Sequence, residues 1–199
     1  NGEMFGEEYT LVAVADYVLK HTPGNTVSNL SSSRALKDVT EAYGQQYHAA
    51  AVGEVNVVAE MKRTHSVIGG EGNGGVIYPE SHYGRDALVG VGLFLSHYVA
   101  QSKKMTELKS TYPPYFISKN KMTLSPDMDV DKILEGLKER YATEKVTDID
   151  GVKIDFAQGW VHLRKSNTEP IIRIYSEAKD EAAANQLAEE VIAAAKSTL

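Results

Sequence analysis

Residues 110–114 read Ser-Thr-Tyr-Pro-Pro and separate two parts of the sequence that differ in character. Adjacent prolines cannot continue a helix, and they favour an extended, semi-rigid connector. We therefore predict a domain boundary here, with one domain in residues 1–110 and a second in residues 111–199. The length of 199 residues allows between one and two domains of about 150 residues, so the chain can supply both.

Helical and strand-like segments alternate on the N-terminal side of the connector. Apolar residues recur at helical spacing in residues 7–20, and Pro23-Gly24-Asn25 ends this pattern before a strand-like stretch. Repeated strand-then-helix units predict a layered α/β/α domain with a central sheet. The expected strands are residues 26–30, 47–52, 66–68 and 76–78, and the further helices are residues 34–43, 54–63 and 86–101.

The C-terminal side is dominated by strands. Asp150-Gly151 and Gln158-Gly159 have the composition of tight turns between them. An alanine-rich helix ends the chain. This order predicts a smaller α+β domain with a mostly antiparallel sheet and helices on one face. The expected strands are residues 116–121, 146–149, 152–156, 160–164 and 171–177, with an earlier helix at residues 129–141.

Charge and composition exclude several classes of function. The chain has 21 basic and 27 acidic residues and a net charge of -6, the opposite of the usual nucleic-acid-binding protein. Any bound anion must therefore be held by a local basic cluster. The absence of cysteine excludes disulfides and cysteine metal sites, and it is consistent with a cytoplasmic protein.

Neither a membrane span nor a secretory signal is expected. Glycine, serine and histidine interrupt the longest apolar stretch, residues 87–100, before it reaches the length of about 20 residues that a bilayer requires. The first residues lack the basic and apolar regions of a signal peptide. They also lack an initiator methionine, so we expect the chain to be cut from a longer protein.

Residues 164–173, Arg-Lys-Ser-Asn-Thr-Glu-Pro-Ile-Ile-Arg, gather the densest set of polar groups in the chain. They form the turn between two predicted strands. Two guanidiniums, two hydroxyls, an amide and the backbone N–H groups of a tight turn suit the terminal oxygens of a phosphate. The alternative is an ordinary polar hairpin with one exposed ion pair from an arginine to Glu169.

Residues 69–75, Gly-Gly-Glu-Gly-Asn-Gly-Gly, form a second candidate site. No Gly-Lys-Ser/Thr follows, and the next residues suggest a strand, so a nucleotide-binding loop is not indicated. Glu71 and Asn73 offer a carboxylate and an amide, a pair suited to the vicinal hydroxyls of a sugar. A flexible turn whose polar residues face water is an equal alternative.

No residue pattern predicts a metal site. The histidines lack HExxH spacing, and the acidic run around Asp129 lacks the glycine and the final glutamate of a calcium loop. Asp129 or Asp127 is instead expected to cap a helix. His162 alternates with apolar neighbours and is expected at the surface, whereas Trp160 is expected to anchor the core.

The two candidate loops together resemble those of the α-D-phosphohexomutases, enzymes that interconvert hexose 1- and 6-phosphates. Residues 160–173 are similar to the phosphate-binding loop of the family's last domain, and residues 68–76 to the sugar-binding loop of its third domain. Their order and spacing agree, and Asp150-Gly151 also fits. The resemblance therefore covers essentially the whole chain, and it implies a TATA-binding-protein-like fold for the second domain.

This resemblance implies roles for particular residues. The phosphate of the substrate that is not being transferred would be bound by Arg164, Ser166, Asn167, Thr168 and Arg173. Glu71 and Asn73 would contact the sugar hydroxyls. Because family members pass a phosphoryl group between a phosphoserine and either end of the sugar, one site must hold the distal phosphate in two substrate orientations, which a rigid nest of donors can do.

The family's catalytic motifs do not occur in this sequence. Its serine loop, of the Ser-His-Asn-Pro type, and its magnesium loop, Asp-Gly-Asp-x-Asp-Arg, belong to the first two domains. The resemblance thus implies no catalytic residue here, magnesium bound by ligands outside this chain, two preceding domains as partners, and no mutase activity by the chain alone. A stand-alone phosphosugar-binding or regulatory module is the alternative.

The sugar loop departs from the commoner family pattern, Gly-Glu-x-Ser-Gly-His. Asn73 stands in place of the serine and Gly75 in place of the histidine, and Glu54 lies near a position where many members carry basic residues. These differences leave glucose, mannose and glucosamine phosphates all open as substrates.

Overall fold

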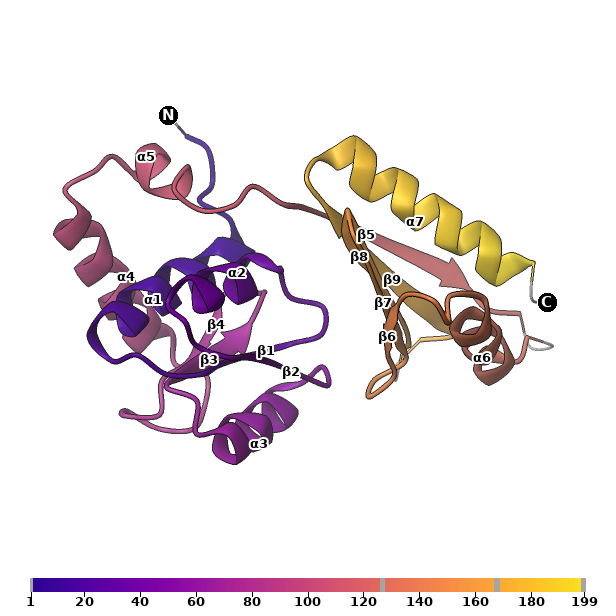
Figure 1. The fold of residues 1–199 in the computed structure, drawn as a ribbon, viewed down its shortest axis with the longest axis horizontal. Coiled ribbons are helices and arrows are strands. Elements are labelled where there is room, and N and C mark those ends of the chain that lie inside the picture. Colours follow the sequence, from indigo (N-terminus) through magenta and orange to yellow (C-terminus); the bar gives the residue numbers. More distant parts are fainter. Residues whose placement is uncertain (1, 126–127, 167–168, 198–199) are drawn as a thin grey trace. The chain divides into compact units, whose positions relative to one another are not determined.

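The computed structural model describes residues 2–125, 128–166 and 169–197. The chain forms two compact units, Asn1–Pro114 and Tyr115–Leu199, and each is described by itself (Figure 1). The first unit ends at Pro114 rather than at the predicted residue 110. Each unit has its own sheet, a mixed one in the first and an antiparallel one in the second.

The first unit is built on a four-stranded mixed sheet. Its strands are β1 (Thr26–Asn29), β2 (Tyr47–Ala50), β3 (Ile68–Glu71) and β4 (Gly75–Ile77), in the order β2-β1-β3-β4. β1 is parallel to β2 and to β3, whereas β3 and β4 form an antiparallel hairpin. The chain leaves β1 toward β2 and then crosses back to β3, so the topological switch point lies between β1 and β3.

Helices cover both faces of this sheet, which confirms the α/β/α prediction. α1 (Glu7–His21) and α2 (Ala35–Ala42) lie on one face, and α3 (Glu54–Thr64) lies on the other (Figure 1). α4 (Ala87–Gln101) packs against α1 and β4. A short helix that was not predicted, α5 (Met105–Lys109), follows it. No described helix has the length and apolar character needed to cross a membrane.

Buried hydrogen bonds tie the connector to the first unit. The Tyr112 hydroxyl donates to Asp16 Oδ2 (3.0 Å) and lies 2.7 Å from His97 Nε2, and Tyr9 donates to the Pro113 carbonyl (2.6 Å). Burial raises the pKa of the Asp16 carboxyl, but hydrogen bonds from His97, Tyr43 and Tyr112 together bring it below its ordinary value. The connector is therefore a fixed part of the first unit as far as Pro113.

The second unit contains a five-stranded antiparallel sheet in the order β5-β9-β8-β7-β6. α6 (Val130–Arg140) and α7 (Glu181–Lys196) pack beside it, and a core of aliphatic side chains fills the space between helices and sheet. This confirms the α+β prediction. The strands are β5 (Phe116–Thr123), β6 (Lys145–Thr147), β7 (Val152–Phe156), β8 (Gly159–Lys165) and β9 (Ile171–Ala178).

Side-chain caps explain where several helices begin. Asp86 accepts hydrogen bonds from the N–H groups of Leu88 (2.9 Å) and Val89 (3.0 Å) at the start of α4. Asp129, one of the two residues expected to cap, does the same at the start of α6, with Asp131 and Lys132 as donors. Asp127 lies outside the described residues.

Two local predictions were wrong. The strand that was expected to end at Ile68 continues through the glycines to Glu71. Glycine occurs within this strand because the neighbouring backbone is too close for a side chain: a β-carbon on Gly69 would lie 2.8 Å from the Val27 carbonyl oxygen. His162 is 1% exposed rather than at the surface, with Nε2 2.7 Å from the Asp150 carbonyl. Burial lowers its pKa to about 4.

Trp160 is fully buried, as expected, and its indole N–H donates to Glu177 Oε1 (2.7 Å).

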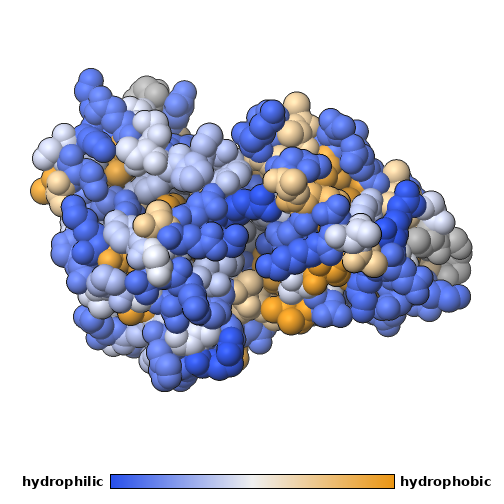
Figure 2. Space-filling model, in the orientation of Figure 1, coloured by the Kyte–Doolittle hydropathy of each residue, from blue (hydrophilic) through white to orange (hydrophobic). Residues whose placement is uncertain are grey.

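The surface drawn in Figure 2 is mostly hydrophilic, with hydrophobic patches between the polar areas. This surface agrees with the charged composition of the chain.

Candidate functional site

The phosphate-binding candidate lies where β8 and β9 meet. The register pairs Arg164 of β8 directly with Arg173 of β9, and the Ser166 N–H continues the ladder to the Ile171 carbonyl (3.0 Å). Directly paired residues of antiparallel strands point to the same face. The two arginines therefore project side by side from the face opposite the aliphatic core, which contains Leu163 and Ile172.

A third cation continues this row onto β5. Lys121 is paired in register with Arg173, so Lys121, Arg173 and Arg164 lie on three adjacent strands and share one face. Like charges directly opposite each other destabilise a sheet. Lys121 was not among the residues predicted for the site. The signal that could have identified it is the pair Lys119 and Lys121, which lie two residues apart on β5 and so share a face.

Only one of these three cations has a carboxylate partner among the residues that the structure describes. Arg173 Nη2 lies 3.0 Å from Glu169 Oε2, which is the ion pair of the polar-hairpin alternative. Arg164 and Lys121 have none in that part of the chain. The row thus has more positive charge than its single carboxylate neutralises, a property suited to an anion.

Of the other predicted phosphate-loop residues, Ser166 lies within the described part of the chain. Ser166 is 8% exposed at the end of β8. Asn167 and Thr168 lie outside the described residues. Gly151 has φ +65, and a β-carbon there would collide with the Leu163 carbonyl and approach Arg164 Cα to 2.8 Å. The predicted Asp150-Gly151 turn therefore packs against the backbone that carries Arg164.

The sugar-binding candidate lies in the first unit, at the carboxyl ends of the parallel strands. Glu71 ends β3, and its Oε1 accepts a hydrogen bond from Asn29 Nδ2 (3.0 Å) at the end of β1. Ser32 Oγ accepts from the Gly72 N–H (2.9 Å) and so joins the loop after β1 to the hairpin. This edge, at the switch point, is where open α/β sheets bind ligands.

Arg85 joins the carboxylates of this edge. Its Nε lies 2.8 Å from Glu54 Oε2, its N–H donates to Glu54 Oε1 (3.1 Å), and its Nη1 lies 3.3 Å from Glu71 Oε2. The hydrogen bond from Arg85 lowers the pKa of the Glu54 carboxyl. Glu71 is only 5% exposed. Arg85 was missed by sequence analysis, since it comes close only through the folded hairpin.

Asn73 occupies the turn of the same hairpin. Its Oδ1 accepts a hydrogen bond from the Gly75 N–H (3.1 Å), and the residue is exposed. The side chain thus closes the turn while its amide nitrogen stays at the surface.

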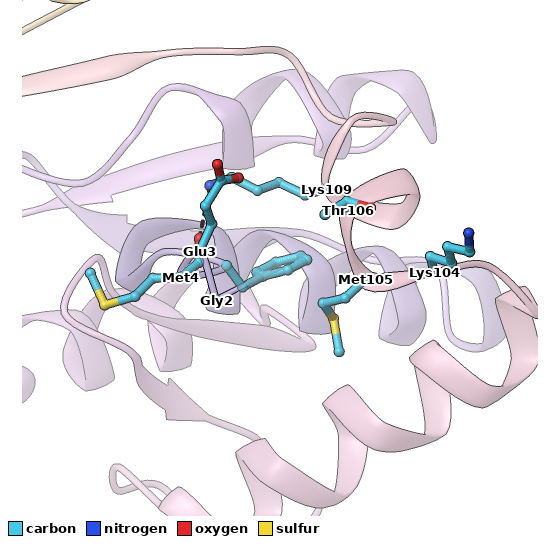
Figure 3. Close-up of a pocket in the computed structure, with 8 residues that line it drawn as sticks. Gly2, Glu3, Met4, Lys104, Met105, Thr106 and Lys109 are labelled. Atoms are coloured by element: carbon cyan, nitrogen blue, oxygen red, sulfur yellow. Dashed lines mark hydrogen bonds between the residues drawn. The ribbon is translucent and has the colours of Figure 1, made fainter.

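A separate cavity of about 370 Å³ lies between the N-terminal segment and α5 and contains none of these residues. Figure 3 shows its labelled Met4, Met105 and Lys104 side chains extending in different directions rather than toward one point. Within residues 2–125, 128–166 and 169–197, no group of three histidine or acidic side chains could hold a metal ion.

Comparison with known proteins decides the family. The profile described as phosphoglucomutase/phosphomannomutase, alpha/beta/alpha domain III, matches residues 6–115, and the profile of the C-terminal domain of the same family matches residues 119–194. The chain belongs to the phosphoglucomutase/phosphomannomutase family. This confirms the resemblance, and the two units correspond to the family's domain III and C-terminal domain.

Curated relatives of this family extend well beyond the chain. Phosphoglucomutase/phosphomannomutase of Thermococcus kodakarensis is 36% identical over 192 residues, which are 95% of this chain and 42% of that protein. Phosphoglucosamine/phosphogalactosamine mutase of Sulfurisphaera tokodaii is also 36% identical, over 83% of this chain and 37% of that protein. The chain thus spans about two fifths of the length of these relatives.

Solved structures share the fold of this chain. A family protein from Burkholderia thailandensis has a TM-score of 0.81 at 22% identity, over 99% of this chain and 43% of that one. Aspergillus fumigatus N-acetylphosphoglucosamine mutase, solved with GlcNAc-6P and magnesium, has a TM-score of 0.58 at 14% identity, over 95% of this chain and 46% of that one.

Proposed function

We propose that this chain is the substrate-recognition half of a cytoplasmic phosphohexomutase. The whole enzyme would interconvert a hexose 1-phosphate and a hexose 6-phosphate through a phosphoserine. Family membership and the relatives' names support this reaction class. The observation that carries the proposal within this chain is the row of cations on three adjacent strands of the second unit, in which only Arg173 has a carboxylate partner among the described residues.

The phosphate that is not transferred binds to this row. Arg164 and Arg173 donate charge-assisted hydrogen bonds to its oxygens, and Ser166, Asn167 and Thr168 supply further donors from the turn. The contacts depend on the charge and shape of the phosphate and not on the sugar carbon that carries it. The same site can therefore serve both orientations of the substrate, as a 1,6-interconversion requires.

The sugar hydroxyls bind at the edge of the parallel sheet, to Glu71 and Asn73. A carboxylate and an amide accept and donate hydrogen bonds, so together they can recognise neighbouring hydroxyls. The Asn29–Glu71 hydrogen bond supports this assignment because it fixes the carboxylate in place before a substrate arrives.

Phosphoryl transfer itself belongs to other domains of the same polypeptide. Since the serine and magnesium motifs do not occur in the sequence, we assign the nucleophile and the magnesium ligands to two preceding domains and expect no mutase activity from this chain alone. The residues of this chain would bind and orient the substrate, while the magnesium ion supplies charge neutralisation at the transferring phosphoryl group.

Binding measurements on the 199-residue chain test the recognition role. Calorimetric titration should detect glucose 1-phosphate and glucose 6-phosphate but not glucose, and Arg164→Ala should weaken both phosphosugars by about 10- to 100-fold, the value of one charge-assisted hydrogen bond. Lys132→Ala, which removes an exposed cation from α6, is the matched control. Equal binding of glucose and its phosphates would contradict the phosphate site.

Activity measurements test the division of labour. A coupled assay should detect isomerisation by the longer polypeptide and none by this chain. Turnover by the chain alone would contradict the proposal. A coding sequence without serine and aspartate-rich loops upstream of Asn1 would favour the alternative, a stand-alone phosphosugar-binding module.

A further inference from the structure

Arg85 extends from the start of α4 back along β4 to the sugar hairpin. Its backbone pairs with Ile77, and the next residue, Asp86, donates its N–H to the Val76 carbonyl (2.9 Å). The side chain then passes over Gly75, where a β-carbon would lie 2.7 Å from Arg85 Cδ. The guanidinium reaches Glu71 because position 75 has no side chain.

Position 75 and Arg85 therefore compete for the same space. A side chain at this position would require the arginine stem to move, so the glycine and the arginine form a matched pair. The hairpin thus receives a nitrogen donor from residue 85, in the segment just before α4.

Arg85, rather than Glu71, is the accessible group of this cluster. The Arg85 side chain is 46% exposed, whereas that of Glu71 is 7% exposed. Nε and Nη1 of Arg85 are engaged by Glu54 and Glu71, and Nη2 has no partner in the described part of the chain. A ligand that approaches Glu71 therefore meets a free guanidinium donor beside it.

The local charge favours a hydroxyl over a phosphate as the ligand of this donor. Arg85 has two carboxylate neighbours, Glu54 and Glu71, and its single charge neutralises only one of them. Negative charge at this edge repels a phosphate dianion. A neutral hydroxyl can accept from Nη2 and donate to Glu71.

We propose that Arg85 determines which hexose epimer the sugar site accepts. Nη2 donates to one ring hydroxyl while Nη1 holds the Glu71 carboxylate that accepts from a hydroxyl, so the pair recognises the direction of a hydroxyl at the ring. The inference rests on the proposed function and names the residue that sets its substrate preference.

The test uses the mutase polypeptide that contains this chain. Arg85→Ala should change the ratio of kcat/KM for glucose 1-phosphate to that for mannose 1-phosphate by about 10-fold or more. Gly75→Ala should shift the ratio in the same direction, because it displaces the arginine without removing it. Arg63→Ala, which breaks the exposed Arg63–Glu60 pair on α3 of the same unit, should leave the ratio within about twofold.

A structural readout accompanies the kinetics. In the isolated chain, NMR titration should show the Glu54 pKa rising toward its ordinary value in Arg85→Ala, with an unchanged circular dichroism spectrum. An unchanged epimer ratio in both variants, or an equal loss for all substrates, would overturn the inference while leaving the proposed function in place. No turnover by the wild-type polypeptide on any hexose phosphate would overturn both.

Discussion

Replacing Arg164 by glutamine should weaken phosphate binding and at the same time stabilise the second unit. Arg164 faces Arg173 across the strand pair and has no carboxylate partner among the described residues. Two unit charges about 5 Å apart repel by about 0.8 kcal/mol in water, and directly opposed like charges in sheets cost about 0.2–1 kcal/mol. Arg164→Gln should therefore raise the free energy of unfolding by about 0.5 kcal/mol at low salt.

The same substitution removes a charge-assisted hydrogen bond to the phosphate. Such a bond contributes about 1.5–3 kcal/mol, so the affinity for glucose 6-phosphate should fall by about 10- to 100-fold. A residue that serves only the fold would show the reverse pattern, because its loss would lower stability and leave binding unchanged. Loss of affinity together with a gain in stability is the signature of a group placed for a ligand.

Urea denaturation followed by tryptophan fluorescence measures the stability change. The chain has a single tryptophan, Trp160, which is buried on β8 four residues before Arg164, so its emission reports on the unit that contains the site. The gain should shrink as added salt screens the repulsion. Lys132→Gln on α6 is the control with the same change in charge.

Loss of more than about 1 kcal/mol in Arg164→Gln would refute this reasoning, because the guanidinium would then hold the fold together. Unchanged affinity for glucose 6-phosphate would refute the site itself.

Three further predictions concern the parts that support the two sites. Tyr112→Phe should lower the free energy of unfolding of the first unit by about 1–2 kcal/mol, because it removes the contacts with Asp16 and His97. Circular dichroism should detect this loss while the fluorescence transition of Trp160 in the second unit stays unchanged. A change in both transitions would contradict a connector that is fixed to the first unit. The pKa of His162 is about 4 in the folded state against an ordinary 6.5, so the unfolded state takes up the proton first as the pH drops. The free energy of unfolding should therefore fall by up to about 3 kcal/mol between pH 6.5 and pH 4. Urea titrations at each pH should show that His162→Gln removes this pH dependence, and an unaltered dependence would contradict the buried neutral ring. Asp86→Ala should cost about 1 kcal/mol in thermal unfolding through loss of the α4 cap, while Asp86→Asn should retain most of it; equal losses would show that the cap is not the cause.

The sequence predicted the architecture because its signals are local. Periodicity and turn residues indicated nearly every helix and strand. The domain boundary was predicted at residue 110, and the first unit ends at Pro114. The short helix α5 was not predicted, because a five-residue segment is too short to show a helical periodicity of apolar residues. His162 was misjudged because alternation along a strand identifies the two faces but does not say which residues cover them.

The candidate site was predictable only in part. Arg164, Arg173 and Glu71 were predicted as site residues from their own loops, since each stands in a dense local motif. Lys121 and Arg85 belong to other segments, and they approach the loops through strand register and through the space above Gly75. These contacts cannot be predicted from the loop sequences alone. They depend on which residues the strand register places opposite each other and on the free space above Gly75 that the long Arg85 side chain fills.

The β3–β4 hairpin also limits how this family member can evolve. A side chain at Gly70 would collide with the Gly75 carbonyl, and one at Gly75 would displace Arg85. A substitution at position 70 would therefore require the backbone to shift, and one at position 75 would require the Arg85 side chain to move. A substitution at position 75 would move Arg85, so the sugar site would change even though every side chain proposed to touch the ligand keeps its identity.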